Sequence, residues 1–390
     1  MKLLINTESL QPPITGIGTY TQHLLEQFAE TQAFEEIECF SGHHFSSATQ
    51  VLQGCHAHTQ PGSVPPRSPQ GLLHRMLRNS SLAYRAREAW RNNLLRLQSA
   101  RLRDFVYHEP NFILRAHKGP CVATIHDLSF IHYPQHHPAK RVAWLKQELP
   151  RTLKRADFII TDSECVRKEI LARYNVAETK VRKIYLGASD QFRPLTAQAT
   201  KETLNSYNLT HGEYILFVGT LEPRKGIDIL LSAWRTLPKQ LLNNKKLVIA
   251  GAAGWSNQDL LASIKKLEEE GTLRHVRFIP PNHLPAFYAG ACLFVYPSIY
   301  EGFGLPVLEA MRSGAPVLCA TDTAMEEFSN GSTQTFQNGF SEDLAEQLKH
   351  LLQDEAYRSS LAQRGLQAAQ AYSWKRCAEE TMHIYKLIAG

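Results

Sequence analysis

The chain has 390 residues, of which 43% are apolar and 21% carry a formal charge. A single hydrophobic core rarely extends beyond about 250 to 300 residues, so we expect two domains. No segment reaches the roughly 18 uninterrupted apolar residues of a membrane-spanning helix, and the apolar run after Lys2 stops at Asn6, too early for a signal peptide. We therefore expect a soluble, cytoplasmic protein.

Cysteine and histidine usage argues against a metal centre. The seven cysteines are odd in number and form no CxxC pair, which disfavours a zinc cluster and a disulfide framework. The histidine doublets at 43–44 and 136–137 lack the HExxH pattern and any regular ligand spacing. We predict reduced thiols and no metal site.

Charge is divided unevenly along the chain. Residues 1–195 carry 25 Lys/Arg against 17 Asp/Glu, and the remaining residues carry 18 against 20. The stretch 67–103 holds nine arginines and one acidic residue, with apolar and aromatic residues at roughly helical spacing. Two interpretations stay open: peripheral contact with an anionic inner membrane face, where each basic residue contributes ~1 kcal/mol, or ordinary helices with a solvated basic face.

In chain order, the first half alternates apolar runs of strand length with amphipathic helices. The expected strands are 2–6, 37–40, 121–127, 155–163 and 180–187, and the expected helices are 19–30 and 164–173. A polar loop is expected after the second of these strands. This alternation predicts a parallel sheet covered by helices.

The second half repeats the pattern. Its expected strands are 213–220, 246–251, 275–279, 292–298 and 315–321, with helices at 227–237, 259–271, 283–291 and 306–314. A polar stretch at 190–207 has no strand pattern and is typical of a linker. The sequence thus predicts a first domain at 1–196, a second at 197–372 and a C-terminal helix at 373–390.

The strongest local signal is PSIYEGFGLPVLEAMRSGAPV, residues 297–317, where Glu301 and Glu309 flank a glycine-rich turn that enters a helix. Gly302 and Gly304 let the backbone approach a ligand, and the N–H groups at the helix start suit a diphosphate. Glu309 would reach ribose hydroxyls, and Glu301 would accept hydrogen bonds from a sugar. A helix cap with an exposed acid explains either glutamate alone, but not the glycines and proline of the same turn.

A second signal is FVGTLEPRKGID, residues 217–228. A strand ends at Gly219, and the next loop bears Arg224 and Lys225 before a helix begins. Arginine can hold phosphate oxygens through two hydrogen bonds and lysine acts as a point charge. Two such residues on a loop are otherwise usually solvated, but the carboxyl end of a parallel strand is where ligands bind, which favours a diphosphate site.

Two weaker signals lie in the first half. TGIGTY places Gly16 and Gly18 before a helix but has Thr21 where a dinucleotide fingerprint has its third glycine. The segment CVATIHDLSF ends a strand at His126. A lone histidine is more often a structural residue than a ligand, so its role depends on other support.

Together these segments resemble the retaining glycosyltransferases of the GT-B fold called glycosyltransferase family 4, which includes bacterial mannosyltransferases of lipopolysaccharide and capsule assembly. The match runs nearly end to end. EGFGLPVLE is highly specific, VGTLEPRKG supports it, and TIHDLSF is typical of a mannosyltransferase-like branch, while TGIGTY is loosest because Thr15 stands where many relatives have Gly. The resemblance implies two Rossmann-like domains facing across a cleft, the first binding the acceptor and the second binding the nucleotide-sugar donor. It also implies that WKRCAEETMHIYKLI is a C-terminal helix that crosses back to the first domain.

The resemblance also implies residue roles. Arg224 and Lys225 would bind the donor diphosphate and stabilise the departing charge, Glu301 would hold hydroxyls of the donor sugar, and His126 would contact that sugar near its reaction centre. These four are the expected catalytic residues. The expected donor-binding residues also include Gly16, Gly18, Gly219, Phe303, Gly304, Leu305 and Glu309, with backbone amides serving at 303–305.

The mechanism and substrates follow from the same resemblance. The chain has no DxD, the usual metal-diphosphate clamp of the other glycosyltransferase fold, so positive side chains and helix dipoles replace a divalent ion. No residue stands out as a nucleophile, which favours front-face attack over a covalent intermediate on Glu301. We expect a GDP-linked mannose or deoxyhexose donor, with UDP-glucose and UDP-N-acetylglucosamine open, and an acceptor glycan on a polyprenyl-diphosphate lipid. Base selectivity would depend on loops around 279–282.

Two functions from other classes fit the sequence less well. A nicotinamide-dependent oxidoreductase needs a complete GxGxxG directly after the first strand, which the chain lacks. A nucleic-acid-binding protein could use the Arg-rich stretch but has no need of the EGFGLPVLE turn. We expect no nucleic-acid partner.

Overall fold

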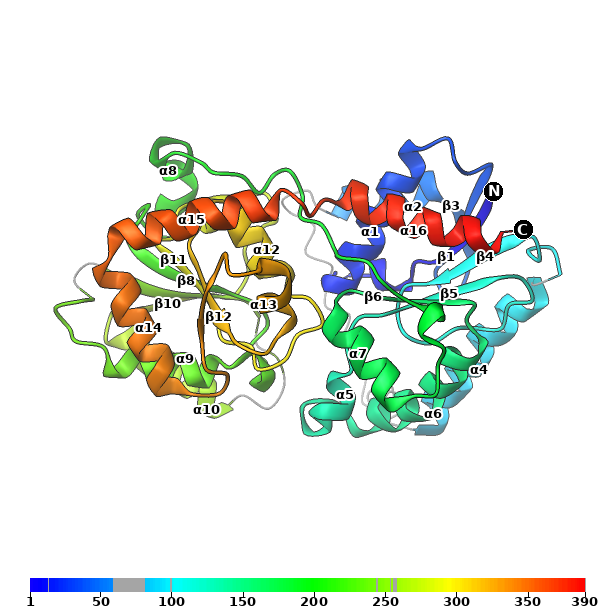
Figure 1. Ribbon diagram of the computed structural model, residues 1–390, viewed down its shortest axis with the longest axis horizontal. Helices are drawn as coiled ribbons and strands as arrows, with labels where there is room; N and C mark the ends of the chain where they lie inside the picture. The colour runs from blue at the N-terminus through cyan, green and yellow to red at the C-terminus, as the bar shows by residue number, and fades with distance from the viewer. Residues whose placement is uncertain are drawn as a thin grey trace, which may run out of the picture. The chain divides into compact units, whose positions relative to one another are not determined.

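The computed structural model describes residues 1–12, 14–58, 81–98, 100–242, 245–252, 254 and 258–389. The chain divides into two compact units, each with its own sheet (Figure 1). The first unit comprises Met1–Asp162, Val166–Tyr185 and Trp374–Gly390, and the second comprises Ser163–Cys165 and Leu186–Ser373. Among the described residues, no helix is both long and apolar enough to cross a bilayer.

The first unit contains a seven-stranded sheet in the order β3-β2-β1-β4-β5-β6-β7. All neighbouring strands pair in parallel except β2 and β3, which form an antiparallel edge. The strands are β1 Lys2–Asn6, β2 Glu36–Phe40, β3 Phe45–Ser47, β4 Phe105–Glu109, β5 Cys121–Ile125, β6 Phe158–Thr161 and β7 Val181–Lys183.

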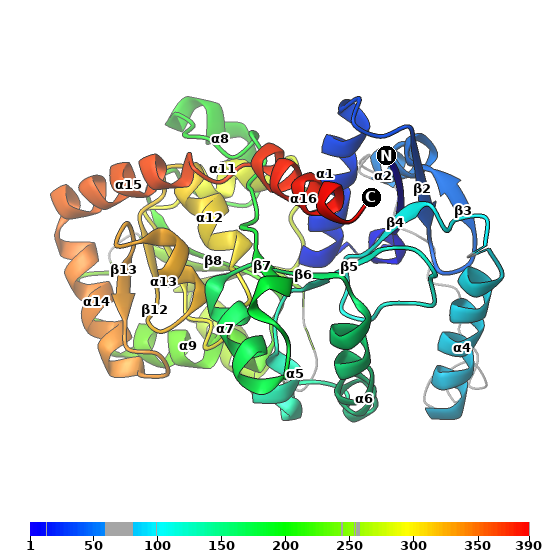
Figure 2. The ribbon, with the colours of Figure 1, turned by 45° about the vertical axis from the view of Figure 1, so that its right-hand side comes forward.

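Helices cover both faces of this sheet (Figures 1 and 2). One core cluster joins alternate strand residues, such as Leu4 and Ala123, to Leu95 of α4 and Leu149 of α6. That alternation is expected because successive strand side chains point to opposite faces. The helices are α1 Gly16–Glu30, α2 Ala48–His58, α4 Ser81–Gln98, α5 Ser129–His132, α6 Ala139–Arg155, α7 Glu164–Arg173 and α16 Trp374–Ile388, with short 3-10 turns η1 Glu8–Leu10, η2 Pro134–His136 and η3 Glu178–Lys180.

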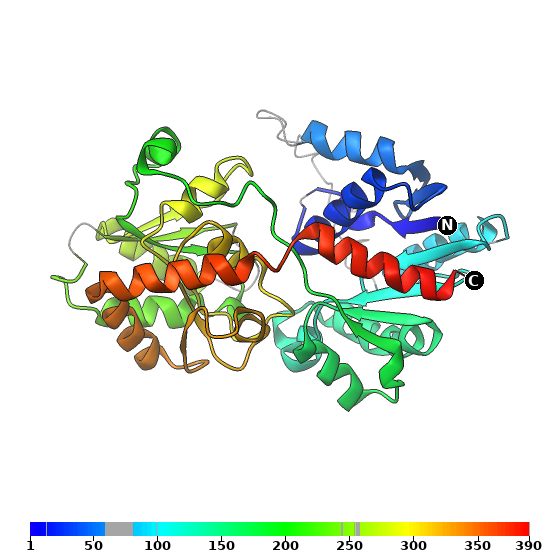
Figure 3. The same cartoon turned by 45° about the horizontal axis from the view of Figure 1, so that its top comes forward.

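The C-terminal helix α16 packs on α1 within the first unit, as the family resemblance implied (Figure 3). Tyr385 is fully buried and its hydroxyl lies 2.6 Å from Nδ1 of His108 on β4. At the other end of α16, the Trp374 ring stacks on His23 of α1 at a centroid distance of 4.8 Å. These contacts fix the last helix to the first sheet although the long segment Leu186–Ser373 of the second unit precedes it in the chain.

The second unit contains a six-stranded parallel sheet in the order β10-β9-β8-β11-β12-β13. Its strands are β8 Tyr214–Val218, β9 Lys246–Ala250, β10 Leu273–Val276, β11 Leu293–Tyr296, β12 Val317–Ala320 and β13 Gln334–Phe336. Its helices are α8 Ala197–Asn205, η4 Pro223–Lys225, α9 Ile227–Thr236, α10 Gln258–Glu269, α11 Leu284–Ala289, α12 Leu305–Arg312, α13 Ala324–Ser329, α14 Ser341–Gln353 and α15 Glu355–Ala369. This strand order, reversing beside β8, is that of a Rossmann-like domain.

The division between the units falls after Tyr185, earlier than the sequence-based boundary at 196. The polar segment that looked like a linker packs on the second unit. The Phe192 ring contacts Tyr288 edge-on at 5.6 Å between centroids, and Asp190 forms an ion pair with Arg312 at 2.7 Å. These contacts explain why the segment groups with the second sheet.

Several elements of the first unit were not predicted from the sequence. The segment expected as a polar loop after β2 contains β3 and α2, and the strand β4 and the helix α6 were not anticipated. β4 is only five residues long, yet it lies between β1 and β5 in the middle of the sheet and every one of its residues is buried. α6 carries Pro150 inside the helix, but its buried residues Val142, Leu145 and Leu149 recur at helical spacing, so a helical pattern was present in the sequence.

Candidate active site

A cationic loop follows β8 in the second unit. Gly219 ends that strand, where its N–H donates to the carbonyl of Ala250 at 2.9 Å. The η4 turn then presents Arg224 and Lys225. Gly226 closes the turn at φ +65°, and a Cβ there would lie 2.1 Å from the carbonyl oxygen of Pro297. Only glycine therefore allows the cationic loop to press against the segment that leads to Glu301.

Arg224 and Lys225 both form hydrogen bonds to the same carboxylate oxygen of Glu301. Oε1 accepts from Lys225 Nζ at 2.5 Å and from Arg224 Nη1 at 3.2 Å. Ser298 Oγ donates to the same oxygen at 2.6 Å, and the Tyr296 hydroxyl lies 3.4 Å from it. Among the described residues none bonds to Oε2, so that oxygen keeps its hydrogen-bonding capacity.

The electrostatics of this cluster keep Glu301 ionised. Burial alone would raise the pKa of Glu301, but the charges of Lys225 and Arg224 outweigh burial and lower that pKa to about 2. Burial lowers the pKa of Lys225, and the Glu301 carboxylate opposes that shift. The Glu301 carboxylate is thus held between two cations. Glu222 also forms an ion pair with Arg224, at 3.3 Å.

Gly304 shapes the entrance to α12. Its backbone is left-handed, with φ +104°, and a Cβ at this position would lie 2.6 Å from Cγ of Met325. Phe303 is buried and its ring stacks on Phe328 at 4.5 Å, so its side chain belongs to the core. The part of this turn that a ligand could reach is therefore backbone and not the Phe303 side chain.

Glu309 lies on α12 in a different electrostatic setting. The Tyr288 hydroxyl donates to its Oε2 at 2.7 Å. Burial raises the pKa of Glu309 to about 7, and no cation among the described residues is close enough to offset the loss of solvent. Glu301, in the turn, and Glu309, in the helix that follows it, thus have pKa values that are shifted in opposite directions. Glu301 is held as an anion, and Glu309 exchanges a proton near neutrality.

Aromatic residues connect the surroundings of the two glutamates. Tyr288 contacts Phe294 edge-on at 5.4 Å, and Phe294 stacks beside Tyr296 at 5.9 Å. Tyr288, Tyr296 and Ser298 were not predicted from the sequence as partners of the site. Tyr296 and Ser298 directly precede the conspicuous turn, at the carboxyl end of β11, which is the one signal that could have identified them.

His126 follows β5 in the first unit and is almost fully buried. Its Nδ1 lies 2.6 Å from Oδ2 of Asp162, and its Nε2 lies 2.7 Å from the carbonyl oxygen of Pro110. The carbonyl of Pro110 can only accept, so Nε2 donates to it, and one proton is shared between Nδ1 and the Asp162 carboxyl group. Burial would lower the pKa of His126, but the Asp162 charge and hydrogen bond raise it overall. Both ring nitrogens of His126 are therefore engaged within the first unit.

Gly16 and Gly18, expected before the helix, lie in the first turn of α1 and have different surroundings. A Cβ on Gly18 would lie 2.6 Å from the carbonyl oxygen of Ser9, so Gly18 lets α1 pack against the segment after β1. A Cβ on Gly16 would meet nothing within 4 Å. Close packing thus explains why position 18 is glycine. At position 16 the space around the residue does not require glycine.

The predicted site residues thus form separate groups. In the second unit, Arg224, Lys225 and Glu301 contact one another, while Glu309 contacts Tyr288. Gly16, Gly18 and His126 belong to the first unit. All seven cysteines are free, and within the described residues no group of three or more His, Cys, Asp or Glu side chains could hold a metal ion.

Comparison with known proteins identifies the family. Residues 14–192 match the family described as Glycosyltransferase Family 4, and residues 201–368 match Glycosyl transferases group 1. O-antigen chain mannosyltransferase B of Escherichia coli is 34% identical over the whole length of both chains. Serotype-specific mannosyltransferase WbdA, also of Escherichia coli, is 30% identical over 58% of this chain and 28% of that protein.

Solved structures agree on the fold. A crystal structure of Anabaena Alr3699/HepE in complex with UDP and glucose matches 99% of both chains with a TM-score of 0.71 and 17% identity. WaaG, a glycosyltransferase involved in lipopolysaccharide biosynthesis, matches 98% of this chain and 99% of its own with a TM-score of 0.70 and 16% identity.

Two Rossmann-like domains with these structural neighbours define the GT-B fold. The full-length relative and the two family matches narrow the class further. The chain belongs to glycosyltransferase family 4. This membership removes the oxidoreductase and nucleic-acid-binding alternatives.

Proposed function

We propose that this protein transfers mannose from GDP-mannose, with retention of anomeric configuration, to a lipid-linked glycan of a cell-surface polysaccharide such as O-antigen. The end-to-end likeness to an O-antigen chain mannosyltransferase supports the mannosyl and O-antigen parts of the proposal. The arrangement of Arg224, Lys225 and Glu301 supports sugar-nucleotide chemistry at this site.

The main support for the proposal is that, within the described residues, only one of the two carboxylate oxygens of Glu301 is hydrogen-bonded. Its Oε1 is bonded to Lys225, Arg224 and Ser298, which leaves Oε2 to accept hydrogen bonds from sugar hydroxyls. The same contacts hold the cationic side chains in place before any ligand arrives. Preorganised charges stabilise a developing charge without reorganisation at the moment of reaction.

In the proposed reaction, the bond between the anomeric carbon and the β-phosphate oxygen breaks, and the acceptor hydroxyl oxygen bonds to that carbon from the same face. The acceptor proton passes to the departing phosphate oxygen. Arg224 and Lys225 stabilise the charge on the diphosphate, and Glu309 binds the ribose. His126, in the first domain, is held in one orientation by Asp162 and by the carbonyl of Pro110.

We propose that the reaction needs no divalent metal. The support is the absence of DxD from the sequence and the presence of paired cations beside the glycine turn. Activity should therefore survive EDTA. A strict requirement for magnesium or manganese would contradict this account of the leaving group.

The donor is tested by measuring thermal shifts with GDP and UDP, followed by transfer from GDP-mannose to a lipid-linked glycan. We expect GDP to raise the melting temperature more than UDP does, and GDP-mannose to be consumed. Stabilisation and turnover with UDP-glucose alone would favour the other donor class. An anomeric assignment of the product by NMR tests retention.

We also propose that the protein works in the cytoplasm, in peripheral contact with an anionic membrane through the Arg-rich segment 67–103. Residues 67–80 and 99 lie outside the described part of the chain. On α4, Trp90 and Leu97 are exposed, with 51% and 78% of their surfaces accessible, which supports the contact. Arg91 is instead buried and paired with Glu8 and Glu88, so it does not contribute to it.

Co-sedimentation with vesicles tests this contact. Wild-type protein should pellet with phosphatidylglycerol vesicles and not with phosphatidylcholine vesicles. The double variant Trp90→Ala/Leu97→Ala should pellet less, whereas Phe340→Ala, which removes an equally exposed ring from the second unit, should behave as wild type. Equal pelleting of all three proteins would refute a role for α4.

A further inference from the structure

The two faces of β4 carry different polar side chains. Glu109 lies on the face toward α4 and α6, where it lines a cavity of about 270 Å³. That cavity adjoins another of about 520 Å³ between the two helices, and the two share part of their lining. His108 precedes Glu109 in the strand, so its side chain points to the opposite face, where it meets Tyr385 of α16.

A hydrogen-bonded chain of buried side chains crosses this opposite face. The Tyr385 hydroxyl lies 2.6 Å from Nδ1 of His108, and Nε2 of His108 lies 2.8 Å from the hydroxyl of Thr124 on β5. The Thr124 hydroxyl in turn lies 3.0 Å from the hydroxyl of Tyr20 on α1. Each of these residues is at most 1% exposed. We call them the Tyr20–Tyr385 chain, and it joins the last helix to the first through two central strands.

The charge state of His108 gives this chain a single direction. Burial lowers the pKa of His108 to about 3, so its ring is neutral at physiological pH. A neutral imidazole has one donor and one acceptor nitrogen, so the hydroxyls of Tyr385 and Thr124 take opposite roles toward it. Thr124 has one proton to donate, so its bond to Tyr20 continues in the same direction. Such chains strengthen cooperatively, and losing one hydroxyl disturbs every bond in them.

The Tyr20–Tyr385 chain leads to His126. The ring of Tyr20 meets the ring of His126 edge-on, with centroids 5.0 Å apart and planes at 82°. His126 follows Thr124 by two positions, so both side chains lie on the side of the sheet that α1 covers. The hydrogen bonds to Asp162 and Pro110 fix the line through the two nitrogens of His126. The packed ring of Tyr20 limits the tilt of the imidazole about that line.

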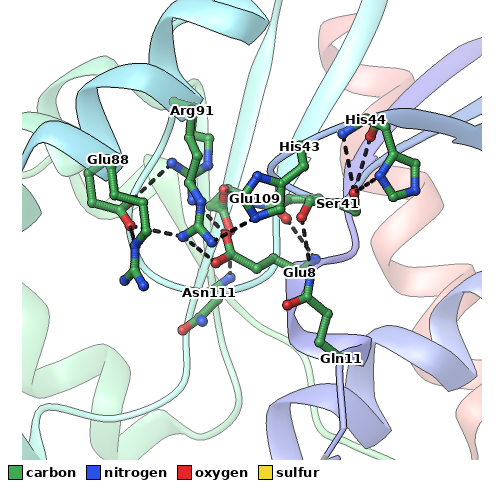
Figure 4. A network of polar contacts seen from close by, with 12 residues as sticks. Glu8, Gln11, Ser41, His43, His44, Glu88, Arg91, Glu109 and Asn111 are labelled. Carbon is green, nitrogen blue, oxygen red and sulfur yellow. Dashed lines mark hydrogen bonds and ion pairs between the residues drawn. The ribbon is translucent and has the colours of Figure 1, made fainter. Parts of the chain in front are cut away.

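The acceptor of Nε2 is fixed separately from this chain. After Pro110, the N–H of Asn111 donates to Oε1 of Glu109 at 3.3 Å. Glu109 and Asn111 belong to the network of polar contacts in Figure 4, in which Arg91 forms ion pairs with two glutamates. The hydrogen bonds of His126 thus lead to β6 and to the segment after β4, whereas its contact with Tyr20 leads to α1 and α16.

Resting on the proposed function, in which His126 is an expected catalytic residue, we propose that Tyr20 is a positioning residue for His126. The C-terminal helix holds the Tyr20 hydroxyl in place through His108 and Thr124. α16 therefore acts on the orientation of the His126 ring as well as on the stability of the first unit. Loss of a hydroxyl from the chain tilts that ring and slows the reaction without weakening substrate binding.

Thr124 offers the sharpest test because its hydroxyl bonds to both neighbours in the chain. Thr124→Val removes the hydroxyl and nearly keeps the shape of the side chain, whereas Thr124→Ser keeps the hydroxyl. We expect Thr124→Val to lower kcat with GDP-mannose about tenfold, because small misplacements of a catalytic group are costly. The KM values for donor and acceptor should stay within about twofold of wild type. Thr124→Ser should recover most of the lost kcat.

An NMR measurement separates positioning from stability. In protein that contains isotope-labelled histidine, the ring signals of His126 are assigned by their loss in His126→Gln. We expect these signals to shift in Thr124→Val and to stay in place in Thr124→Ser. Thr381→Val is the control, because it removes a buried hydroxyl of α16 that bonds within the helix to the carbonyl of Cys377. It should lower the melting temperature without moving the His126 signals or changing kcat.

Tyr385→Phe is the second variant and decides the question alone if Thr124→Val does not fold. It removes the hydroxyl at the far end of the chain and keeps the ring. It should shift the His126 signals in the same direction as Thr124→Val, and the double variant should add little because one break already interrupts the chain. The proposal is overturned if the folded variants keep the wild-type His126 signals, or if Thr381→Val moves those signals equally.

The NMR measurement needs no substrate, so it separates this proposal from the proposed function. If wild type does not consume GDP-mannose but the His126 signals respond as expected, the donor proposal fails while the link from α16 to His126 stands. If wild type consumes GDP-mannose and Thr124→Val and Tyr385→Phe keep the wild-type kcat, the positioning role fails while the transferase assignment stands.

Discussion

Lys225 Nζ lies 2.5 Å from Oε1 of Glu301, and both side chains are largely buried at the edge of the second sheet. The pair joins the loop after β8 to the turn before α12, two segments separated by 76 residues. Breaking a buried pair by removing one partner is costly because the other charge remains uncompensated. Each substitution in this pair therefore affects both the donor chemistry and local stability.

Glu301→Gln should lower kcat by about 100-fold or more. The amide cannot hold both cations as a carboxylate does, and its NH2 group would face either them or the donor sugar. The measurement is turnover with GDP-mannose, with circular dichroism to verify the fold. Glu270→Gln, at an exposed position on the second unit, is the control and should be fully active.

Lys225→Ala should weaken nucleotide-diphosphate binding by about tenfold to 100-fold, since hydrogen bonds to charged groups contribute about 1.5 to 3 kcal/mol. Calorimetric titration with GDP measures the effect. Lys239→Ala removes an exposed lysine of the same unit and should bind GDP normally. Unchanged GDP affinity in Lys225→Ala would mean that the diphosphate binds elsewhere.

Gly304→Ala should destabilise the second unit more than Gly331→Ala does. Both glycines have positive φ, which costs a non-glycine residue about 1 to 2 kcal/mol. Only at position 304 would the new Cβ also collide, with Met325 at 2.6 Å, while position 331 has nothing within 4 Å. Overpacking adds about 1 to 3 kcal/mol. Equal melting temperatures for the two variants would show that Met325 moves aside freely.

Glu309→Gln should alter how stability depends on pH. The pKa of Glu309 is about 7 in the folded chain against 4.5 for the unperturbed group, so its favourable contribution is complete below about pH 4.5 and is lost as pH rises through 7. The shift corresponds to a contribution on the order of 3 kcal/mol. The glutamine variant does not ionise. The melting temperature of the variant minus that of wild type should therefore increase as pH rises from about 5 to about 8. Glu346→Gln, an exposed change, should follow wild type throughout.

Local sequence pattern was sufficient where one segment contains the whole signal. The helix at 164–173 was predicted with the bounds that the structure has, and β8, β9 and α9 were predicted within a residue or two. The cationic loop and the glycine turn were recognised because residue type and spacing alone restrict what they can do. In contrast, β4 and α6 were not predicted: β4 has only five residues, and α6 was missed although its buried residues recur at helical spacing.

The hydrogen-bonding partners of the site residues could not be predicted from the sequence. Nothing in the order of residues states that Asp162 lies beside His126, that Tyr288 donates to Glu309, or that Oε1 of Glu301 bonds both cations. These pairs are 21 to 77 positions apart. They meet because neighbouring parallel strands end at a common edge or, for Tyr288 and Glu309, because α11 packs against α12. The two opposite pKa shifts of Glu301 and Glu309 follow from those neighbours.

The sequence by itself determined two α/β domains, the family resemblance and the chemical character of the glycine-rich turn before α12, because hydrophobic period and glycine-rich loops are local properties. Only the tertiary structure decided which oxygen of Glu301 is left open, that both ring nitrogens of His126 are hydrogen-bonded, and that α4 and α6 enclose a groove beside Glu109. The physical reason is that hydrogen-bond geometry and desolvation depend on residues brought together by folding, whatever their separation along the chain.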